Sequence, residues 1–552
     1  MNQKNIISKL TLEEKIAMIH AAGLFRSGAV KRLNIPSLVM SDGPSGVRQE
    51  FENDSWTPID DTTDFVSWLP SNTCLCTTWN PNLARKFGEV LGDEARGRGK
   101  DVILAPGINI KRTPLCGRNF EYMSEDPHLT GRMAVPLVQG IQSQDVAACV
   151  KHFALNNQEC DRLSVDTKVD DKTLFELYLP AFYDALMEGG SYSVMGAYNK
   201  YDGEFCCENA TLLKKILRDL WHYDGVTISD WGGVHNTEKT ALNGVDMEMS
   251  VTPDFDDYKL ANPLLEKVKS GKIDESVIDK RIERILTMME RIKLGDKTRN
   301  KGCTNTKDHQ QTIQQIAEEG IVLLKNDTAH LPLSKETKKI LVLGDNAKRT
   351  HAAGGGSAEI KALYDISPLL GMRMVLGGDA QIDWLPGYYV DNEKHVAGEV
   401  DWQAESLDVD YTTDRGKEQF DKEIRPIREK YLERYSKLHE DMSQWCIYND
   451  DGNSCKRLVD VVFRREPVSE LEGNGVYSVI NGLEAHKEKI LICVNTNYND
   501  MTFYENLRKK LESYEYRTTD VTILTTSFTD TKYKVYFNNN IPKEVRVLVW
   551  YA

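Results

Sequence analysis

Several signals of common protein classes are missing from this chain of 552 residues. It has no run of about 18 consecutive apolar residues, so we expect no membrane-spanning helix. The first residues, MNQKNIISKLTLEEK, contain no apolar stretch of the kind that secretory signals carry. The 11 cysteines are odd in number and form no paired Cys-x-x-Cys pattern. This cysteine usage predicts reduced thiols and a cytoplasmic protein.

Signatures of metals and cofactors are also missing. The sequence has no His-Glu-x-x-His motif, no calcium-binding loop and no Cys/His cluster, so we expect no metal and no cofactor. Basic residues are too few for a polyanion partner, because 69 Lys and Arg against 84 Asp and Glu leave a net charge of −15. An acidic chain of this kind argues against nucleic acid and favours a neutral small-molecule substrate. The sequence gives no indication of an oligomeric state.

What the chain does contain is enough apolar material for a large globular protein. Hydrophobic residues make up 40% of the sequence and charged residues 28%. This composition is typical of folded proteins and excludes disorder over most of the chain. Because single cores stop growing at about 250–300 residues, the length predicts two to four domains.

Residues 1–293 alternate between short apolar runs and helical patterns. Thr11-x-x-Glu14 has the form of a capping box and predicts the start of a helix. Buried strands are predicted at 37–40, 102–105, 147–150, 192–197, 226–229 and 245–249. Helices are predicted at 172–188, 210–221 and 276–292.

This alternation predicts an α/β fold with a parallel sheet, since buried parallel strands read as continuous apolar runs. A stretch of this length favours a (β/α)8-type, TIM-like barrel over residues 1–293. In such barrels the active site lies at the carboxyl ends of the strands. A doubly wound open sheet is the alternative, although no glycine-rich dinucleotide fingerprint follows the first strand.

The rest of the chain predicts a second α/β unit. Residues 294–312 are polar and predict a linker, and residues 313–552 predict a sandwich-like domain. Its strands are predicted at 321–324, 340–343, 489–494, 521–525 and 545–550. Residues 395–488, which include a charged helical pattern at 417–442, predict a divergent insertion. The chain stops two residues after its last apolar run, so we expect this domain to be divergent or truncated.

Polar residues with catalytic chemistry follow the predicted strands. Asp230, in the run GVTISDWGG, would place a carboxylate at the barrel mouth, with Trp231 beside it to stack on a sugar face. The competing interpretation makes Asp230 the N-cap of the next helix. Lys151-His152 follows another strand and implies a polar cavity. That pair predicts a clamp for substrate hydroxyls, a Schiff-base lysine, or a structural ion pair with Glu159 or Asp161.

Four further residues complete the set, namely Asp42 in SDGPSG, Arg118 in CGRNFE, Arg162 in ECDR and Tyr198 in GAYNK. Each is ordinary alone. Together they follow predicted strands on one face of the barrel. A neutral polyol needs such a mixture of carboxylate, cationic and imidazole groups, because several hydroxyls must be hydrogen-bonded at once to offset their desolvation.

At this point the chain resembles a known family, glycoside hydrolase family 3, in its β-glucosidase-type branch. The matching segments are SDGPSGVR (41–48), LAPGINIKRTPLCGRNFEYMSEDP (104–127), VKHFALNNQECDR (150–162), SVMGAYNKYDG (193–203) and ISDWGGVH (228–235). The resemblance extends through EEGIVLLKND (318–327) and AAGGGSAEI (352–360) into that family's second domain. It implies a (β/α)-barrel followed by an α/β sandwich.

The resemblance also implies roles for individual residues. Asp230 corresponds to the catalytic nucleophile of a retaining exo-hydrolase, which would release terminal β-D-glucose from β-glucosides through a covalent glycosyl-enzyme. The sugar-binding positions correspond to Asp42, Arg118, Lys151, His152, Arg162, Tyr198 and Trp231. Nearby cations are expected to hold the pKa of Asp230 down and keep it ionised.

The acid/base residue is the part of the family pattern that the sequence does not reproduce. The family's EGxDR-like run is replaced by NTNYNDMTFYENLRKK after the strand predicted at 489–494. The candidate carboxylates are Asp500, Glu505, Glu470 and Glu472. Two alternatives therefore stay beside the glucosidase: an acid-impaired or non-catalytic sugar-binding relative, and a lyase that uses Lys151 as a Schiff-base nucleophile.

Overall fold

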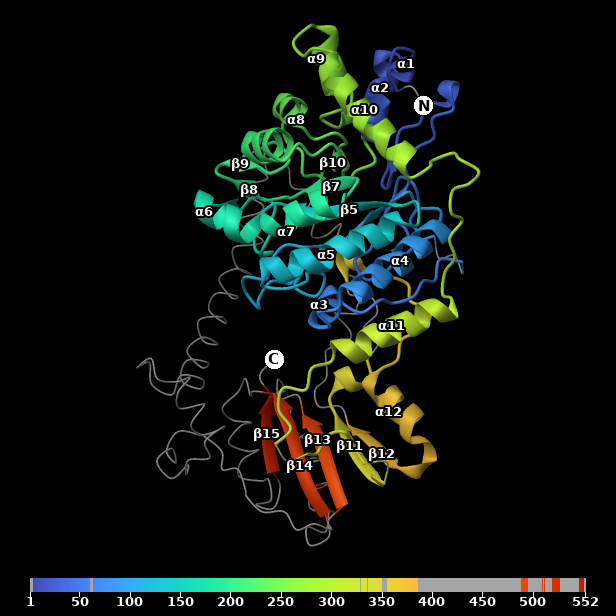
Figure 1. The fold of residues 1–552 in the computed structure, drawn as a ribbon, viewed down its shortest axis with the longest axis vertical. Helices are drawn as coiled ribbons and strands as arrows, with labels where there is room; N and C mark the ends of the chain where they lie inside the picture. Colours follow the sequence, from blue (N-terminus) through green and yellow to red (C-terminus); the bar gives the residue numbers. More distant parts are fainter. Residues whose placement is uncertain are drawn as a thin grey trace. The chain divides into compact units, whose positions relative to one another are not determined.

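The computed structural model describes residues 3–59, 63–327, 329–334, 336–349, 355–385, 488–494, 509, 511, 519–526 and 546–550. The chain divides into two compact units. The first comprises Met1–Lys325 together with Ala352–Asp365, and the second comprises Asn326–His351 together with Ile366–Ala552. Figure 1 shows the first unit from blue to yellow-green, with the strands of the second in yellow, orange and red.

This division differs from the predicted boundaries at residues 293 and 313. The segment predicted as a linker, 294–312, is held by the first unit, because the Arg299 guanidinium donates to the Asp101 carboxylate at 2.7 Å. The segment then runs into helix α11 (Lys307–Gly320), which Thr306 caps by accepting a hydrogen bond from the backbone N–H of His309. Polar composition alone did not distinguish a free linker from a strap fixed by ion pairs.

A parallel five-stranded sheet forms the centre of the first unit, in the order β10-β7-β5-β4-β3. Figure 1 labels β10, β7 and β5 of this sheet. Its strands are β3 (Met40–Asp42), β4 (Val102–Leu104), β5 (Ala147–Phe153), β7 (Ser193–Gly196) and β10 (Val226–Ile228). Five of the six strands predicted in this region therefore form. The register of Met40 with Val102 and of Val102 with Ala147 aligns their carboxyl ends at one edge.

The sheet closes into a barrel through shorter pairings. Segment 245–249 lies beside β10, with Met247 bridging Ile228, and Glu248 in turn bridges His20. Strands β1 (Ala21–Gly23) and β2 (Arg26–Ser27) pair antiparallel, and the backbone N–H of Met40 donates to the Phe25 carbonyl at 2.8 Å. The predicted TIM-like barrel is thus confirmed, with one short antiparallel strand among its parallel ones.

Helices surround this barrel. They are α1 (Gln3–Ile7), α2 (Leu12–Met18), α3 (Asn72–Thr77), α4 (Pro81–Gly97), α5 (Pro127–Gln142), α6 (Asp171–Thr173), α7 (Pro180–Tyr183), α8 (Thr237–Asn243), α9 (Asn262–Lys269) and α10 (Ser276–Arg291). The predicted capping box is present at α2, where Thr11 and Glu14 bond to each other's backbone N–H. No helix in the described part of the chain combines the length and apolarity that crossing a membrane requires.

Two of the three predicted helices contain wider π-helical turns. The helix predicted at 172–188 is divided into α6, Leu174–Tyr178, α7 and Asp184–Glu188. Pro180 explains the interruption, because it lacks a backbone N–H to continue the α-helical ladder. The helix predicted at 210–221 is π-helical over Thr211–Leu220. A small sheet of β6 (Asp166–Thr167), β8 (Lys200–Tyr201) and β9 (Glu204–Phe205) lies in the loops after β5 and β7.

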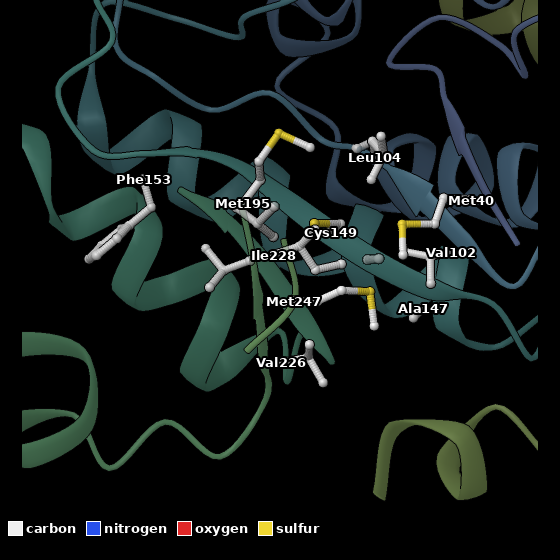
Figure 2. Close-up of a cluster of buried hydrophobic side chains, with 14 of the residues drawn as sticks. Met40, Val102, Leu104, Ala147, Cys149, Phe153, Met195, Val226, Ile228 and Met247 are labelled. Atoms are coloured by element: carbon white, nitrogen blue, oxygen red, sulfur yellow. The ribbon is translucent and has the colours of Figure 1, made fainter. Parts of the chain in front are cut away.

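The interior of the barrel is filled with apolar side chains. Figure 2 shows Met40, Val102, Cys149, Ile228 and Met247 gathered from five different strand segments. All five are fully buried. The core therefore fixes the strands from within and holds the polar residues at their carboxyl ends in place.

The second unit contains a parallel sheet in the order β12-β11-β13-β14-β15. Its elements are β11 (Lys339–Leu343), α12 (Pro368–Leu376), β12 (Gln381–Leu385), β13 (Glu488–Val494), β14 (Thr519–Thr526) and β15 (Arg546–Trp550). Four predicted strands are confirmed, and the α/β sandwich expectation holds. The sequence analysis missed β12, whose alternation of polar and apolar residues is short.

The strand predicted at 321–324 is wrong. These four apolar residues follow directly on α11, pair with no strand among the described residues, and leave Leu324 83% exposed. A run of four apolar residues does not by itself distinguish a strand from a connecting segment. Almost all of the predicted insertion 395–488, including the helical pattern at 417–442, lies outside the described residues.

Candidate active site

The predicted site residues meet at the carboxyl ends of the barrel strands. Asp42 ends β3, Lys151 and His152 lie in β5, and Asp230 follows β10 by two residues. Arg118 comes from the loop after β4, Arg162 from the loop after β5, and Tyr198 follows β7. The parallel register places these strand ends side by side, so residues far apart in sequence share one buried site.

Asp230 has one occupied and one free carboxylate oxygen. Its Oδ1 accepts a hydrogen bond from the backbone N–H of Trp231 at 2.9 Å. Its buried Oδ2 has no hydrogen-bond partner among the described residues and lies 3.7 Å from His152 Nε2. The N-cap interpretation is wrong, because Asn236 caps α8 by accepting from the backbone N–H of Lys239.

Two carboxylates from other elements hold Lys151: that of Asp42 in β3 and that of Glu121 in the loop after β4. Its Nζ lies 3.3 Å from Asp42 Oδ1 and 3.9 Å from Glu121 Oε2. Arg48 Nη1 donates to the second oxygen of Asp42 at 3.3 Å. The structural ion pair that the sequence suggested for Lys151, with Glu159 or Asp161, does not form among the described contacts. Lys151 and its partners instead form part of the site itself.

His152 is fixed from both ring nitrogens. Arg118 Nη2 donates to His152 Nε2 at 2.8 Å, and since arginine can only donate, this nitrogen carries no proton. The proton then resides on Nδ1, which donates to the Tyr122 hydroxyl at 3.1 Å. Arg118 Nε also forms a short contact with Glu121. Burial lowers the pKa of His152 well below its ordinary value, and the neighbouring cations lower it further.

Arg162, Tyr198 and Trp231 line the side of the site near Asp230. The Tyr198 hydroxyl donates to the Trp231 carbonyl at 2.8 Å. The guanidinium of Arg162 lies 5.1 Å from the centre of the Tyr198 ring and pairs with Glu159 at 2.7 Å. The Trp231 ring packs at 5.3 Å against Phe25. All eight predicted site residues are therefore brought together, and the side chain of Arg162 is 25% exposed.

The pKa of Asp230 differs from the sequence expectation. Burial raises the pKa of its carboxyl above the ordinary value, and this exceeds the opposing effect of the cations. Arg118, Arg162 and Lys151 lower the pKa in that order, as does the Trp231 N–H. The cations do lower the pKa of Asp230 as expected, but burial, which that expectation left out, raises the pKa by more.

The site is electrostatically balanced, which suits a neutral, hydroxyl-rich ligand. Four cations and four carboxylates face one another: Arg48, Arg118, Lys151 and Arg162, with Asp42, Glu121, Glu159 and Asp230. Every one of these carboxylates has a cationic neighbour, so the group offers no set of free anionic ligands for a metal. It can instead donate and accept many hydrogen bonds while presenting one unbonded oxygen on Asp230.

Sequence reasoning missed Arg48, Glu121 and Tyr122 as members of the site. Glu121 is 1% exposed and joins Arg118 to Lys151, so it organises the cationic side of the site. Its spacing of three residues from Arg118 was the available signal. The four predicted acid/base candidates, Asp500, Glu505, Glu470 and Glu472, lie outside the described residues, so that prediction stays untested.

Family models match this chain in two consecutive segments. Residues 6–288 match the glycosyl hydrolase family 3 N-terminal domain. Residues 321–523 match the glycosyl hydrolase family 3 C-terminal domain. The first match alone spans half of the chain.

Curated relatives and solved structures agree with this match. The chain is 44% identical over 389 residues to the β-glucosidase BoGH3A of Bacteroides ovatus, covering 68% of this chain and 52% of that protein. It is 37% identical over 412 residues to the thermostable β-glucosidase B of Acetivibrio thermocellus, covering 74% and 53%. The chain thus spans about half the length of the curated relatives it matches.

Among solved structures, β-glucosidase 3B of Thermotoga neapolitana in complex with glucose superposes with a TM-score of 0.68 at 27% identity. That match covers 98% of this chain and 71% of the other. DesR, a β-glucosidase of Streptomyces venezuelae in complex with D-glucose, gives 0.64 at 32% identity, covering 70% and 50%. With both domain models matched in order and the barrel and sandwich both present, this chain belongs to glycosyl hydrolase family 3.

Proposed function

We propose that this chain is a retaining exo-β-glucosidase, which releases terminal β-D-glucose from β-glucosides. The observation that supports this most directly is Asp230, whose Oδ2 is buried, has no hydrogen-bond partner among the described residues and interacts electrostatically with Arg118, Arg162 and Lys151. A carboxylate nucleophile needs one oxygen with a free lone pair and a fixed position. Oδ2 is the free oxygen, and the hydrogen bond from the Trp231 N–H to Oδ1 fixes the position of the carboxylate.

In the proposed mechanism, Asp230 Oδ2 attacks the anomeric carbon while an acid protonates the departing oxygen. Water then hydrolyses the covalent glycosyl-enzyme, with the same acid acting as a base. Lys151, Arg118 and His152 would bind the sugar hydroxyls. Since these groups already hold each other in place through Glu121 and Tyr122, little reorganisation is needed when the sugar enters.

The preference for glucose is supported by similarity. Both solved structures named above are complexes with glucose, and the curated relatives named above are β-glucosidases. The neutral charge balance of the site agrees with an uncharged sugar. We also propose a cytoplasmic location, supported by the free thiols of the eight cysteines whose side chains the structure describes.

The Schiff-base lyase receives less support. A Schiff-base lysine has to present a free amine to a carbonyl substrate. The amine of Lys151 instead lies between the carboxylates of Asp42 and Glu121, and the side chain is 1% exposed.

The test is an intact-mass measurement after incubation with 2,4-dinitrophenyl 2-deoxy-2-fluoro-β-glucoside. Dinitrophenolate leaves without acid assistance, and the fluorine slows hydrolysis of the intermediate. We expect one fluoroglucosyl group on the wild-type chain and none on Asp230→Ala. Asp224→Ala is the matched control, because Asp224 is exposed and pairs only with Arg291 among the contacts described, so this variant should label normally.

Labelling that persists in Asp230→Ala would overturn the assignment of the nucleophile. A chain that binds glucose but forms no adduct would overturn the hydrolase and favour the sugar-binding relative. Trapping of a carbonyl substrate by borohydride, lost in Lys151→Met, would favour the lyase instead.

A further inference from the structure

Outside the candidate active site, three side chains of different chemistry meet at the surface of the first unit. Cys303 Sγ lies 2.8 Å from Asp93 Oδ2, and His309 Nε2 lies 3.2 Å from the same oxygen. The sulfur, the carboxylate oxygen and the imidazole nitrogen all lie within 4.8 Å of one another. No short motif joins them in the sequence, because more than 200 residues separate Asp93 from Cys303.

The imidazole of His309 is oriented by a second carboxylate. Its Nδ1 lies 2.9 Å from Glu94 Oε1, so it donates to Glu94 while Nε2 points toward Asp93 and Cys303. Glu94 is 1% exposed and is itself fixed, because its oxygens accept from the backbone N–H groups of Ser67 at 2.8 Å and Asn305 at 3.0 Å. A histidine held through one nitrogen by a buried carboxylate is the arrangement that metal-binding histidines adopt.

The backbone around Cys303 is fixed as well. A Cβ atom at Gly97 would lie only 2.9 Å from the Cys303 carbonyl carbon, so the two backbones are in direct contact. Gly302, at φ +69°, turns the chain over the end of α4. The thiol therefore reaches the cluster from a packed backbone and not from a free loop.

We propose that Asp93, Cys303 and His309 bind one divalent transition-metal ion of the zinc class, with water as the remaining ligand. Thiolate, imidazole and carboxylate are the ligands that zinc accepts together, whereas calcium and magnesium require oxygen alone. Ligand atoms around a tetrahedral zinc lie about 3.3–3.6 Å apart given its usual bond lengths. The separation of 3.2 Å between His309 Nε2 and Asp93 Oδ2 is close to this range, and the 2.8 Å between Cys303 Sγ and the same oxygen would lengthen when an ion binds between them.

The ion would have a structural role. Its ligands come from α4, from the strap that follows residue 294, and from α11, so binding would join three segments of the first unit. Because the ligands are assembled only in the folded chain, a bound ion stabilises that state. Without metal, His309 pairs with the carboxylates of Asp93 and Glu94.

Cobalt(II) tests the proposal without using enzymatic activity. The full chain, freed of metal with a chelator, is titrated with Co²⁺ and its absorption is recorded. We expect one Co²⁺ per chain, with a near-ultraviolet thiolate-to-cobalt band and the visible bands of a tetrahedral ion, all bleached by one equivalent of Zn²⁺. Zn²⁺ should also raise the Tm of the wild-type chain.

The Cys303→Ser variant should lose the thiolate band and the Zn²⁺-dependent rise in Tm. Cys303 is exposed, so its metal-free Tm should match the wild type. Cys160→Ser, at a second exposed cysteine, is the matched control and should keep both signals. Glu94→Gln should bind Co²⁺ about 10–100-fold more weakly with the band preserved. A wild-type chain without the band, or a band unchanged in Cys303→Ser, would overturn the proposal.

Discussion

At the scale of single residues, the site is governed by the competition between burial and charge. Asp230 is buried, and burial raises the pKa of its carboxyl. Arg118, Arg162 and Lys151 oppose this without fully reversing it. The result is a carboxyl whose pKa lies above the ordinary aspartate value, so its ionisation is sensitive to each neighbouring cation.

This sensitivity predicts the pH dependence of labelling by the dinitrophenyl fluoroglucoside. Only the ionised carboxyl attacks, so the rate should be full above the pKa of Asp230 and fall as the pH decreases through it. The midpoint should lie above 3.8, the ordinary value. Arg162→Gln removes an attraction that lowers this pKa, so the midpoint should move to higher pH. The rate of adduct formation across a pH series measures it.

The control for this measurement is Arg132→Gln. Arg132 is 40% exposed and pairs with Asp184 and Glu188, away from Asp230. The pH midpoint of labelling for Arg132→Gln should equal that of the wild type. A midpoint for Arg162→Gln at or below the wild-type value would show that Arg162 does not act on the ionisation of Asp230.

Residue chemistry was more accessible from the sequence than residue geometry. Asp230, Lys151 and His152 could be identified because each follows an apolar strand in a matching segment. Glu121 could not, since a glutamate three residues after an arginine occurs on many surfaces. Only the fold shows that Glu121 is buried between Arg118 and Lys151.

At the scale of elements, the segment that closes the barrel contains a buried carboxyl, that of Glu248, which should lower the stability of the folded chain when it ionises. The backbone of Glu248 forms a parallel β-bridge with that of His20. Its side-chain carboxyl accepts a hydrogen bond from the backbone N–H of Leu260 at 2.6 Å. Burial raises the pKa of Glu248 to about 7. The folded state therefore binds a proton that the unfolded chain, with a pKa of 4.5, has already released.

Stability should accordingly fall as the pH rises from about 4.5 to about 7, by about 3 kcal/mol from this group. Glu248→Gln resembles the protonated form and should not show this fall. At pH 8 its Tm should exceed that of the wild type by about 5 °C, and at pH 4.5 the two should agree. Glu283→Gln, at an exposed glutamate, serves as the control and should leave both values unchanged. Equal Tm values at pH 8 would contradict the prediction.

The contact between α4 and α5 depends on glycine. A Cβ atom at Gly88 would lie 2.1 Å from the Leu137 carbonyl oxygen, and one at Gly140 would lie 2.2 Å from that of Arg85. Both neighbours are backbone atoms that no side-chain rotation can move. The two helices can therefore approach this closely only while these positions lack side chains.

Gly88→Ala should lower the stability of the folded chain by about 1–3 kcal/mol, because the helices must separate. This exceeds the gain of up to about 1 kcal/mol that alanine brings to a helix. Gly371→Ala in α12 is the matched control, since its nearest neighbour, Ile366 Cγ2, lies at an ordinary 3.6 Å. Thermal unfolding should show a lower Tm for the first variant only. An unchanged Tm for Gly88→Ala would show that the helices adjust freely.

Elements were predictable where they were long or regular. The helix predicted at 276–292 became α10, and four of five strands predicted in the second unit formed. The pattern failed at 321–324, where four apolar residues are exposed after a helix, and at β12, which is only five residues long and interrupts its apolar residues with Asp383. The π-helical turns were also invisible, because apolar spacing does not reveal which backbone hydrogen bonds shift by one residue.

At the scale of the whole molecule, the first unit contains the proposed sugar-binding residues, and the proposed hydrolysis requires a second catalytic group. The family resemblance assigns that group to the second domain, and the candidates Asp500, Glu505, Glu470 and Glu472 all lie outside the described residues. Strand positions and the parallel α/β fold could be predicted because they follow from the apolar pattern. A single acid in a segment without that pattern could not.

Leaving-group chemistry can identify the acid among these four residues. Replacing it should lower kcat/KM for a cellobioside by about 10²–10⁴-fold, because that leaving group needs a proton. The same variant should still form the fluoroglucosyl adduct from the dinitrophenyl substrate, which needs none. Added azide should restore turnover of dinitrophenyl glucoside as β-glucosyl azide, since azide attacks the intermediate without a base. Of Asp500→Asn, Glu505→Gln, Glu470→Gln and Glu472→Gln, one should show all three effects and the other three serve as its controls. If all four variants hydrolyse the cellobioside at the wild-type rate, the acid lies elsewhere and the resemblance does not extend to this part of the second domain.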